Sequence, residues 1–307
     1  MSISVASNLS LPSLEVPLFT KQEFDNRFNF ELLDTTVENC CRSSMESPKA
    51  FYLFVQRYAH FNGVASSLVT RLASSIGLSR DIFRESNCEI HDEADRGLEV
   101  AAKVLEASIE EFSDDHHQGF SHRTLAQATM KAVGNYAGLS LQERNELSRI
   151  PDWFAQVLAE HAEVYQGKIG NLEALMKAMG FHAASEILAD HEYTIIDKIV
   201  RGEKVDPNFG QYLKDINGKV DLDGKKASAW YWIGVHSSYN KKSVEEGHYL
   251  AALEALDLAV KYCGHSEAEA YKWAFSGFEN FVKVQQTFFK ELQKECFETL
   301  DSLAVRS

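Results

Sequence analysis

Helical periodicity runs along almost the whole of this 307-residue chain, and only five prolines interrupt it. Proline inside a helix removes a backbone hydrogen bond and clashes with the preceding turn, so a chain with few prolines is free to form long helices. No stretch keeps the strict apolar–polar alternation of a half-buried strand. Long apolar stripes with the helical period fall at residues 48–72, 182–200 and 267–300. The pattern predicts an all-α fold, a single helical bundle around one core.

The division of the chain follows from the same pattern. Residues 1–20 are small and polar and predict a flexible N-terminal arm, and residues 21–307 predict one helical domain. Within that domain, separate helices are expected over 171–179 and 182–200, and further helices over 225–237 and 244–262. Ser243 and Glu246 have the spacing of a capping box at the start of the last of these.

Charge and cysteine content exclude several classes of protein. The net charge of −14 is dispersed along the chain, which argues against nucleic acid or an anionic membrane as partner. No apolar run approaches the ~20 residues that span a bilayer, and the N-terminus lacks the pattern of a secretory signal. The five cysteines follow no metal or disulfide spacing, which favours free thiols in a reducing cytoplasm. The oligomeric state stays open, a homodimer included.

The segment from Val244 to Leu253 places Glu245 and His248 three residues apart in an otherwise apolar stretch. Residues three apart share one face of a helix. A Glu-x-x-His pair that faces the interior of a helical bundle is how carboxylate-bridged di-iron proteins hold a metal ion. The competing interpretation is a helix N-terminal acid beside a hydrogen-bonded core histidine, since the motif is common by chance. His236 would join this pair only if the helix breaks before Glu245, and the capping box at Ser243 favours that break.

Other candidate ligands fall on apolar stripes. Glu192 lies between Leu188 and Ile195 on the stripe of its helix, whereas Glu186 lies on the opposite, polar row. A buried carboxylate needs a charge partner, a proton or a metal, so a Glu192 paired with Arg or Lys is the alternative to a ligand. His122 precedes the row of Leu125, Thr129 and Val133, and Glu111 continues the row of Val100 and Val104 in the preceding helix. Glu110 and Asp115 are the alternatives to Glu111.

Four segments together resemble the heme-oxygenase-like proteins, notably the CADD-like group. They are 51–61, 122–134, 183–198, and 230–236 with the Glu245–His248 motif. Members of the relevant branch are non-heme di-iron oxidases and oxygenases with three carboxylate and three histidine ligands. The resemblance therefore implies a metal site of Glu111, His122, Glu192, His236, Glu245 and His248. Such mixed nitrogen and oxygen ligands suit two irons, or iron with manganese, better than zinc, and no heme is expected.

One position departs from the family pattern. That pattern is His-x-x-x-Asp-x-x-His, and this chain has Glu245 for the aspartate but Lys241 where the first histidine belongs. His236 lies five residues earlier. Either an insertion displaces that ligand or one of the two metal sites is impaired.

The resemblance implies an oxidoreductase that uses O2 to oxidise a small organic substrate, amino-acid-like or fatty-acid-like. Two metal-free alternatives compete with it. One is a helical scaffold or binding protein, and the other is an enzyme of the thiaminase or quinone-synthase type on the same fold. The thiaminase type requires a nucleophilic cysteine in the pocket, and no cysteine here has a convincing histidine or acidic neighbour.

Overall fold

The computed structural model describes residues 18–85, 89, 92–106, 109–113, 119–202, 208–239 and 244–304. Its elements, in chain order, are α1 (Lys21–Arg27), α2 (Phe30–Ser44), α3 (Pro48–Asn62), α4 (Ala65–Gly77), α5 (Arg96–Glu106), α6 (Ile109–Phe112), α7 (His122–Tyr136), α8 (Leu141–Leu147), α9 (Asp152–Tyr165), α10 (Leu172–Asp197), the π-helix η2 (Lys198–Gly202), α11 (Phe209–Asp215), β1 (Lys219–Leu222), β2 (Lys225–Ser228), α12 (Tyr231–His236), α13 (Glu245–Tyr262) and α14 (Glu267–Ala304). The predicted all-α bundle is confirmed.

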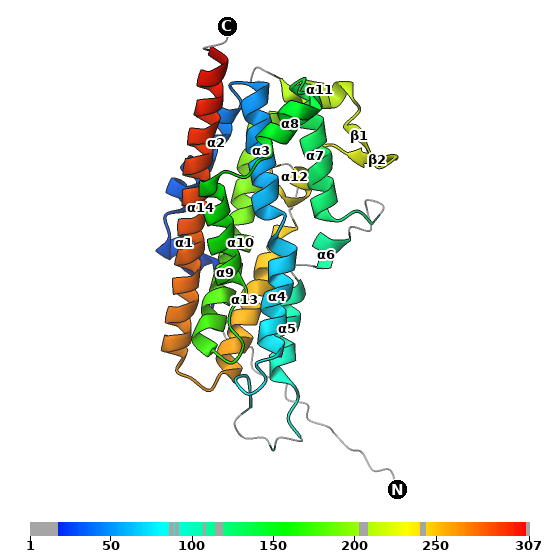
Figure 1. The fold of residues 1–307 in the computed structure, drawn as a ribbon. Helices are drawn as coiled ribbons and strands as arrows, with labels where there is room; N and C mark the ends of the chain where they lie inside the picture. The colour runs from blue at the N-terminus through cyan, green and yellow to red at the C-terminus, as the bar shows by residue number, and fades with distance from the viewer. Residues whose placement is uncertain are drawn as a thin grey trace.

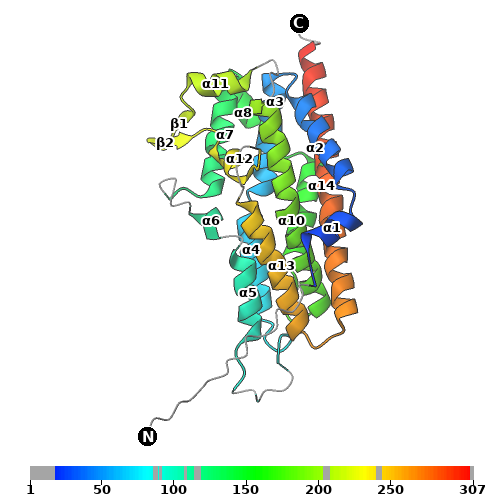
Figure 2. The ribbon, with the colours of Figure 1, turned by 180° about the vertical axis from the view of Figure 1, so that it is seen from behind.

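Helix α10 is the central element of the bundle. It contacts α14, α13, α12, α9, α4 and α2, and Figures 1 and 2 show it in the middle of the bundle, between α13 and α14. Its buried residues point in every direction around the helix, from Leu172 to Asp197. A helix that is apolar all round belongs in the middle of a protein, because it has no wet face to turn outward.

Two segments fold differently from the prediction. The helix expected over 225–237 is replaced by a short antiparallel hairpin, β1–β2, followed by α12. Asp223 and Gly224 form the two-residue loop of that hairpin, and both have positive φ, as a type I′ turn requires. The helices expected over 171–179 and 182–200 are one continuous helix, α10, which passes through Gly180 without a break.

Residues 1–17 of the predicted N-terminal arm lie outside the described residues. The residues that follow are attached to the bundle. The backbone N–H groups of Leu18 and Phe19 donate to the carboxylate of Asp257 at 3.1 and 3.0 Å, and the Phe19 ring is buried. The division into an arm at 1–20 and a domain at 21–307 stays a prediction.

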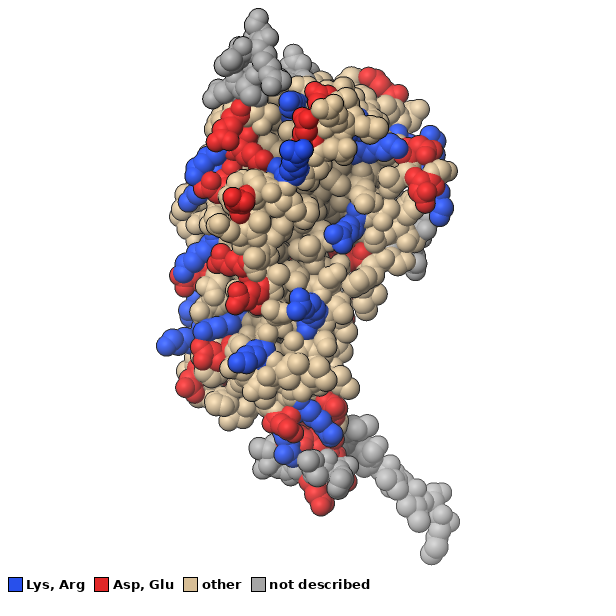
Figure 3. Space-filling view, in the orientation of Figure 1, with Lys and Arg blue, Asp and Glu red and all other residues tan. Residues whose placement is uncertain are grey.

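The described part of the surface mixes both signs of charge. Figure 3 shows acidic and basic side chains interspersed along the α14 edge, with a broad uncharged and hollowed region over the centre of that face. None of the described helices is both long enough and apolar enough to cross a lipid bilayer.

Candidate metal centre

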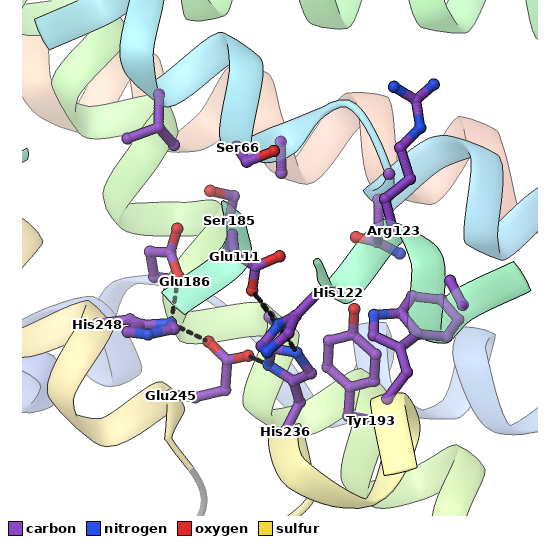
Figure 4. Close-up of a pocket in the computed structure, with 17 residues that line it drawn as sticks. Ser66, Glu111, His122, Arg123, Ser185, Glu186, Tyr193, His236, Glu245 and His248 are labelled. Atoms are coloured by element: carbon purple, nitrogen blue, oxygen red, sulfur yellow. Dashed lines mark hydrogen bonds and ion pairs between the residues drawn. The ribbon is translucent and has the colours of Figure 1, made fainter. Parts of the chain in front are cut away.

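Six carboxylate and imidazole side chains from five helices line one pocket of about 60 Å³ (Figure 4). That volume exceeds the space needed for a single water molecule. The six are Glu111 on α6, His122 on α7, Glu186 on α10, His236 on α12, and Glu245 and His248 on α13. They form two groups of three, in each of which the potential ligand atoms lie within 4.8 Å of one another.

The first group consists of Glu111, His122 and His236. Glu111 Oε1 lies 2.7 Å from His122 Nδ1 and 3.6 Å from His236 Nε2. His236 Nε2 in turn lies 2.9 Å from His122 Nδ1, with the two rings nearly perpendicular. One carboxylate oxygen and two ring nitrogens therefore point toward a common centre.

The second group consists of Glu186, Glu245 and His248. His248 Nδ1 lies 3.5 Å from Glu186 Oε2 and 3.5 Å from Glu245 Oε2. All three side chains are buried. Glu245 and His248 share a face of α13, as their spacing predicts.

Glu245 connects the two groups. Its Oε2 faces His248, while its Oε1 forms a short hydrogen bond with His236 Nδ1. Figure 4 shows this carboxylate between the two histidines. Glu245 therefore belongs to the second group through Oε2, whereas Oε1 holds His236 by Nδ1, the ring nitrogen opposite the Nε2 that faces Glu111 and His122.

The surroundings shift the protonation of these groups in different directions. Burial alone would raise the pKa of Glu111, but hydrogen bonding and charge from His122 and His236 hold that pKa below its ordinary value. Burial raises the pKa of Glu186. His248 has the opposite balance: burial would lower its pKa, yet Glu186 and Glu245 raise that pKa to about 11. The pocket thus holds acidic and basic groups that compensate one another.

Neighbouring side chains contact two of the candidate ligands, Glu186 and His236. The Tyr165 hydroxyl lies 2.8 Å from His182 Nδ1 and 3.0 Å from Ser185 Oγ, and His182 Nδ1 lies 3.3 Å from Glu186 Oε1. The Tyr193 ring stacks on His236 at 4.6 Å. Outer contacts of this kind fix ring and carboxylate orientation at metal sites.

The local sequence explains how the ligands reach the pocket. The Ser121 side chain accepts the N–H of Thr124 and so starts α7 at His122. Helix α12 ends at His236, and α13 begins at Glu245, so the predicted break between His236 and His248 is present. The predicted capping residue, Ser243, lies outside the described residues.

Five of the six predicted ligands come together here: Glu111, His122, His236, Glu245 and His248. Glu192 does not. It is buried on α10 but belongs to neither group, and its alternative, Glu186, completes the second group. The apolar stripe indicated Glu192, yet α10 is buried on all sides, so the opposite row also faces the interior. Asp115, Lys241 and the side chain of Glu110 lie outside what the structure describes.

Periodicity did not identify the rest of the pocket wall. It includes Asn62, Ser66, Arg123, Ser185, Tyr193 and Trp232. Tyr193 is on the same row as Glu186, which is the one sequence signal that would have found it. Among the described residues that line the pocket there is no cysteine.

The chain matches no protein-family model and no curated protein. Among solved structures, it resembles a CADD-like protein of unknown function from Nostoc punctiforme PCC 73102, determined at 2.00 Å resolution. The TM-score is 0.52 at 17% sequence identity, over 90% of this chain and 99% of that chain. The fold is CADD-like. A structure of the same description at 1.35 Å resolution has a TM-score of 0.47 at 15% identity, over 88% and 96% of the two chains. The predicted resemblance to the CADD-like group is thus confirmed for the fold.

Proposed function

We propose that this chain is an O2-dependent oxidoreductase that holds two non-heme metal ions, both iron or iron with manganese. The observation that carries the proposal is that two groups of three candidate ligands line one pocket, with Glu245 in the second group also in contact with His236 of the first. Two groups of three ligands in one pocket, joined by one carboxylate, are suited to a pair of cations. Such a pair supplies the capacity to take up O2 and transfer electrons to it.

The donor set fits iron. Glu111, His122 and His236 give two imidazoles and one carboxylate, the combination typical of non-heme Fe(II) sites. Glu186, Glu245 and His248 give two carboxylates and one imidazole. Neither group contains a thiolate, so the structural zinc sites built from cysteine are a poor match.

The remaining residues have roles that follow from their contacts. The three carboxylates would offset the charge of the bound cations, and the Tyr165–His182 pair would keep Glu186 oriented toward the pocket. Tyr193 and Trp232 form an aromatic wall that excludes water beside His236. The substrate class is a small organic molecule, amino-acid-like or fatty-acid-like.

The free state of the described cysteines, Cys40, Cys41, Cys263 and Cys296, supports a reducing compartment such as the cytoplasm. A metal-free scaffold is the competing proposal. In that case the hydrogen bonds among Glu111, His122, His236 and Glu245 would themselves satisfy the buried polar groups.

Metal analysis of the full-length protein tests the proposal. The protein is loaded with Fe(II) without O2, desalted, and assayed for iron by mass spectrometry. We expect about two irons per chain, because each three-ligand group would hold one ion. Glu186→Ala and His248→Ala should each lower the iron content, because each removes a ligand from the second group.

Glu192→Gln is the matched control, since Glu192 is a buried glutamate of the same helix outside both groups. It should retain the full iron content. Circular dichroism checks that every variant keeps its helices. Iron-free wild-type protein would favour the scaffold. Loss of iron in Glu192→Gln, with retention in Glu186→Ala, would reverse the assignment of the two glutamates.

A further inference from the structure

Glu192 is a buried carboxyl group that the metal centre does not use. Its side chain is 2% exposed. One carboxyl oxygen, Oε1, accepts a short hydrogen bond from the amide of Gln285 on α14. The other, Oε2, is buried and has no hydrogen-bond partner of ordinary geometry among the described residues. A buried acid with one oxygen that lacks a hydrogen bond lowers the stability of the fold, which suggests that it serves a function.

Tyr58 lies beside this carboxyl group. Its hydroxyl is also buried without a partner of ordinary geometry among the described residues. Burial raises the pKa of Glu192 to about 7, and the neighbouring Gln285 amide and Tyr58 hydroxyl oppose that rise. Because Oε1 accepts the Gln285 amide, the proton of the neutral acid belongs on Oε2. A protonated Oε2 and the Tyr58 hydroxyl complement each other as donor and acceptor.

Tyr193 connects Tyr58 to the pocket. The rings of Tyr58 and Tyr193 lie 5.5 Å apart and nearly perpendicular. Burial raises the pKa of the Tyr193 hydroxyl well above its ordinary value, and the Tyr58 hydroxyl opposes that rise. Tyr193 lines the pocket and stacks on His236, as Figure 4 shows. Three groups with exchangeable protons therefore lead from the core to the pocket wall.

We propose that Glu192, Tyr58 and Tyr193 form a buried proton relay, with Glu192 as the proton store and the pocket as the destination. The inference rests on the proposed function, because the reduction of O2 consumes protons and a substrate that fills the pocket displaces water from it. The store is separate from the six proposed ligands, so it can release a proton without giving up a metal contact.

The transfer is balanced at each oxygen. Glu192 Oε2 gives its proton to the Tyr58 oxygen, Tyr58 gives its own to the Tyr193 oxygen, and Tyr193 gives its own to a basic group of the molecule in the pocket. Each tyrosine breaks one O–H bond and forms one, so both stay neutral. Glu192 becomes a carboxylate and the acceptor gains one proton. When the pocket empties, a hydronium ion from solvent gives its proton to the Tyr193 oxygen and becomes water, and the reverse shift restores the acid.

The groups that influence the protonation of Glu192 come from four packed helices. They are Tyr58 on α3, His191 on α10, Glu245 on α13 and the neutral Gln285 on α14. His191 is itself engaged with the Asp34 carboxylate at 3.1 Å. The Glu192 carboxyl group therefore loses its proton near neutral pH, where a proton donor of this kind is most effective.

Infrared difference spectroscopy of the metal-free, full-length protein tests the store without any activity. We expect the C=O band of a buried carboxylic acid to disappear with a midpoint near pH 7. Glu192→Gln should remove this band, and Tyr58→Phe should shift its frequency. Tyr52→Phe is the matched control, a buried tyrosine on the same helix that lines no part of the pocket, and it should leave the band unchanged. If no band depends on Glu192, the proposal is overturned.

The relay itself is tested by the rate at which Fe(II)-loaded protein is oxidised in air-saturated buffer. Glu192→Gln and Tyr58→Phe should each slow oxidation by about tenfold or more at full iron content, and Tyr52→Phe should not. The double variant should be no slower than Tyr58→Phe, because both changes break one route. Unchanged rates at full iron content would overturn the relay and leave the proposed function intact. Wild-type protein that holds no iron would overturn the proposed function itself and the relay with it.

Discussion

Buried histidines have two kinds of surroundings in the described core. His182 is held by the Tyr165 hydroxyl and lies beside Glu186. His161 has neither: both ring nitrogens are buried without a hydrogen-bond partner among the described residues, and its ring packs against Phe61, Phe181 and Phe281. Burial alone lowers the pKa of His161 to about 4. His161 is therefore a neutral, space-filling residue whose polar atoms cost stability.

We predict that His161→Phe makes the protein more stable toward low pH. Below pH 6.5 the unfolded chain binds a proton at His161, but the folded chain does not until about pH 4. The unfolded state thus gains protons first, and the folded state loses stability as the pH falls through this window. The difference between the two pKa values corresponds to on the order of 3 kcal/mol.

Urea unfolding of the metal-free protein at pH 7.5 and pH 5 measures this effect. The free energy of unfolding of His161→Phe, relative to wild type, should be larger at pH 5. His265→Asn, at a histidine whose side chain is 53% exposed, is the surface control. Equal differences at both pH values for His161→Phe would show that the residue binds its proton over the same pH range in the folded and unfolded states.

The sequence predicted which polar residues face the interior where a helix has one exposed face. Glu245 and His248 stood out because their neighbours on α13 are apolar, and both are buried in the pocket. It did not separate Glu186 from Glu192, because both faces of α10 are buried and periodicity cannot say which one meets α13. Only the placement of the neighbouring helices decides between them.

At the scale of elements, the close crossing of α10 and α14 explains why Gly180 does not end a helix. A Cβ atom added at Gly180 would lie 1.9 Å from the carbonyl oxygen of Ala274, and one added at Gly277 would lie 1.8 Å from that of Lys177. The two backbones therefore touch at two reciprocal glycines. In a sequence, a glycine within an apolar run predicts the end of a helix, because glycine inside a helix is unfavourable. Here the close packing between the helices offsets that cost.

We predict that Gly180→Ala destabilises the fold by at least about 2 kcal/mol, because backbone atoms on both sides must move apart to admit the methyl group. Thermal unfolding of the metal-free protein measures the change. Gly277→Ala should have an effect of the same sign and similar size, since it affects the same crossing.

Gly247→Ala is the control for this prediction. Gly247 lies in α13, and a Cβ atom there would have no neighbour within 4 Å. Alanine should leave stability unchanged or raise it by up to about 1 kcal/mol through helix propensity. If Gly180→Ala were as well tolerated as Gly247→Ala, the α10–α14 crossing would be looser than the structure indicates.

At the scale of the whole molecule, the pocket is lined by side chains from helices of very different length. Glu186 comes from the 26-residue α10, whereas Glu111 comes from the four-residue α6 and His236 from the six-residue α12. Helices this short are not stable on their own. Periodicity predicted the long helices, and the helix expected over 225–237 covers α12, but it did not predict the hairpin, because short strands owe their structure to packing and turns. The convergence of candidate ligands from separate helices was predicted only by the family resemblance.

The unequal lengths of these helices lead to a prediction about dynamics. Bound metal should cross-link α6, α7, α10, α12 and α13, and the short helices should gain most, because their local opening costs the least free energy before metal binds. Hydrogen–deuterium exchange of the full-length protein, without O2, should show slower exchange in α6, α12 and the first turn of α13 when Fe(II) is added. Helix α14 contributes no ligand to either group and should change little.

Mg²⁺, which prefers oxygen ligands and keeps its water, should produce no such pattern. Glu186→Ala should weaken the protection at α13 more than that at α6, since Glu186 belongs to the second group and Glu111 to the first. Uniform slowing across all helices would contradict a pair of localised sites and would point to a global change in stability instead.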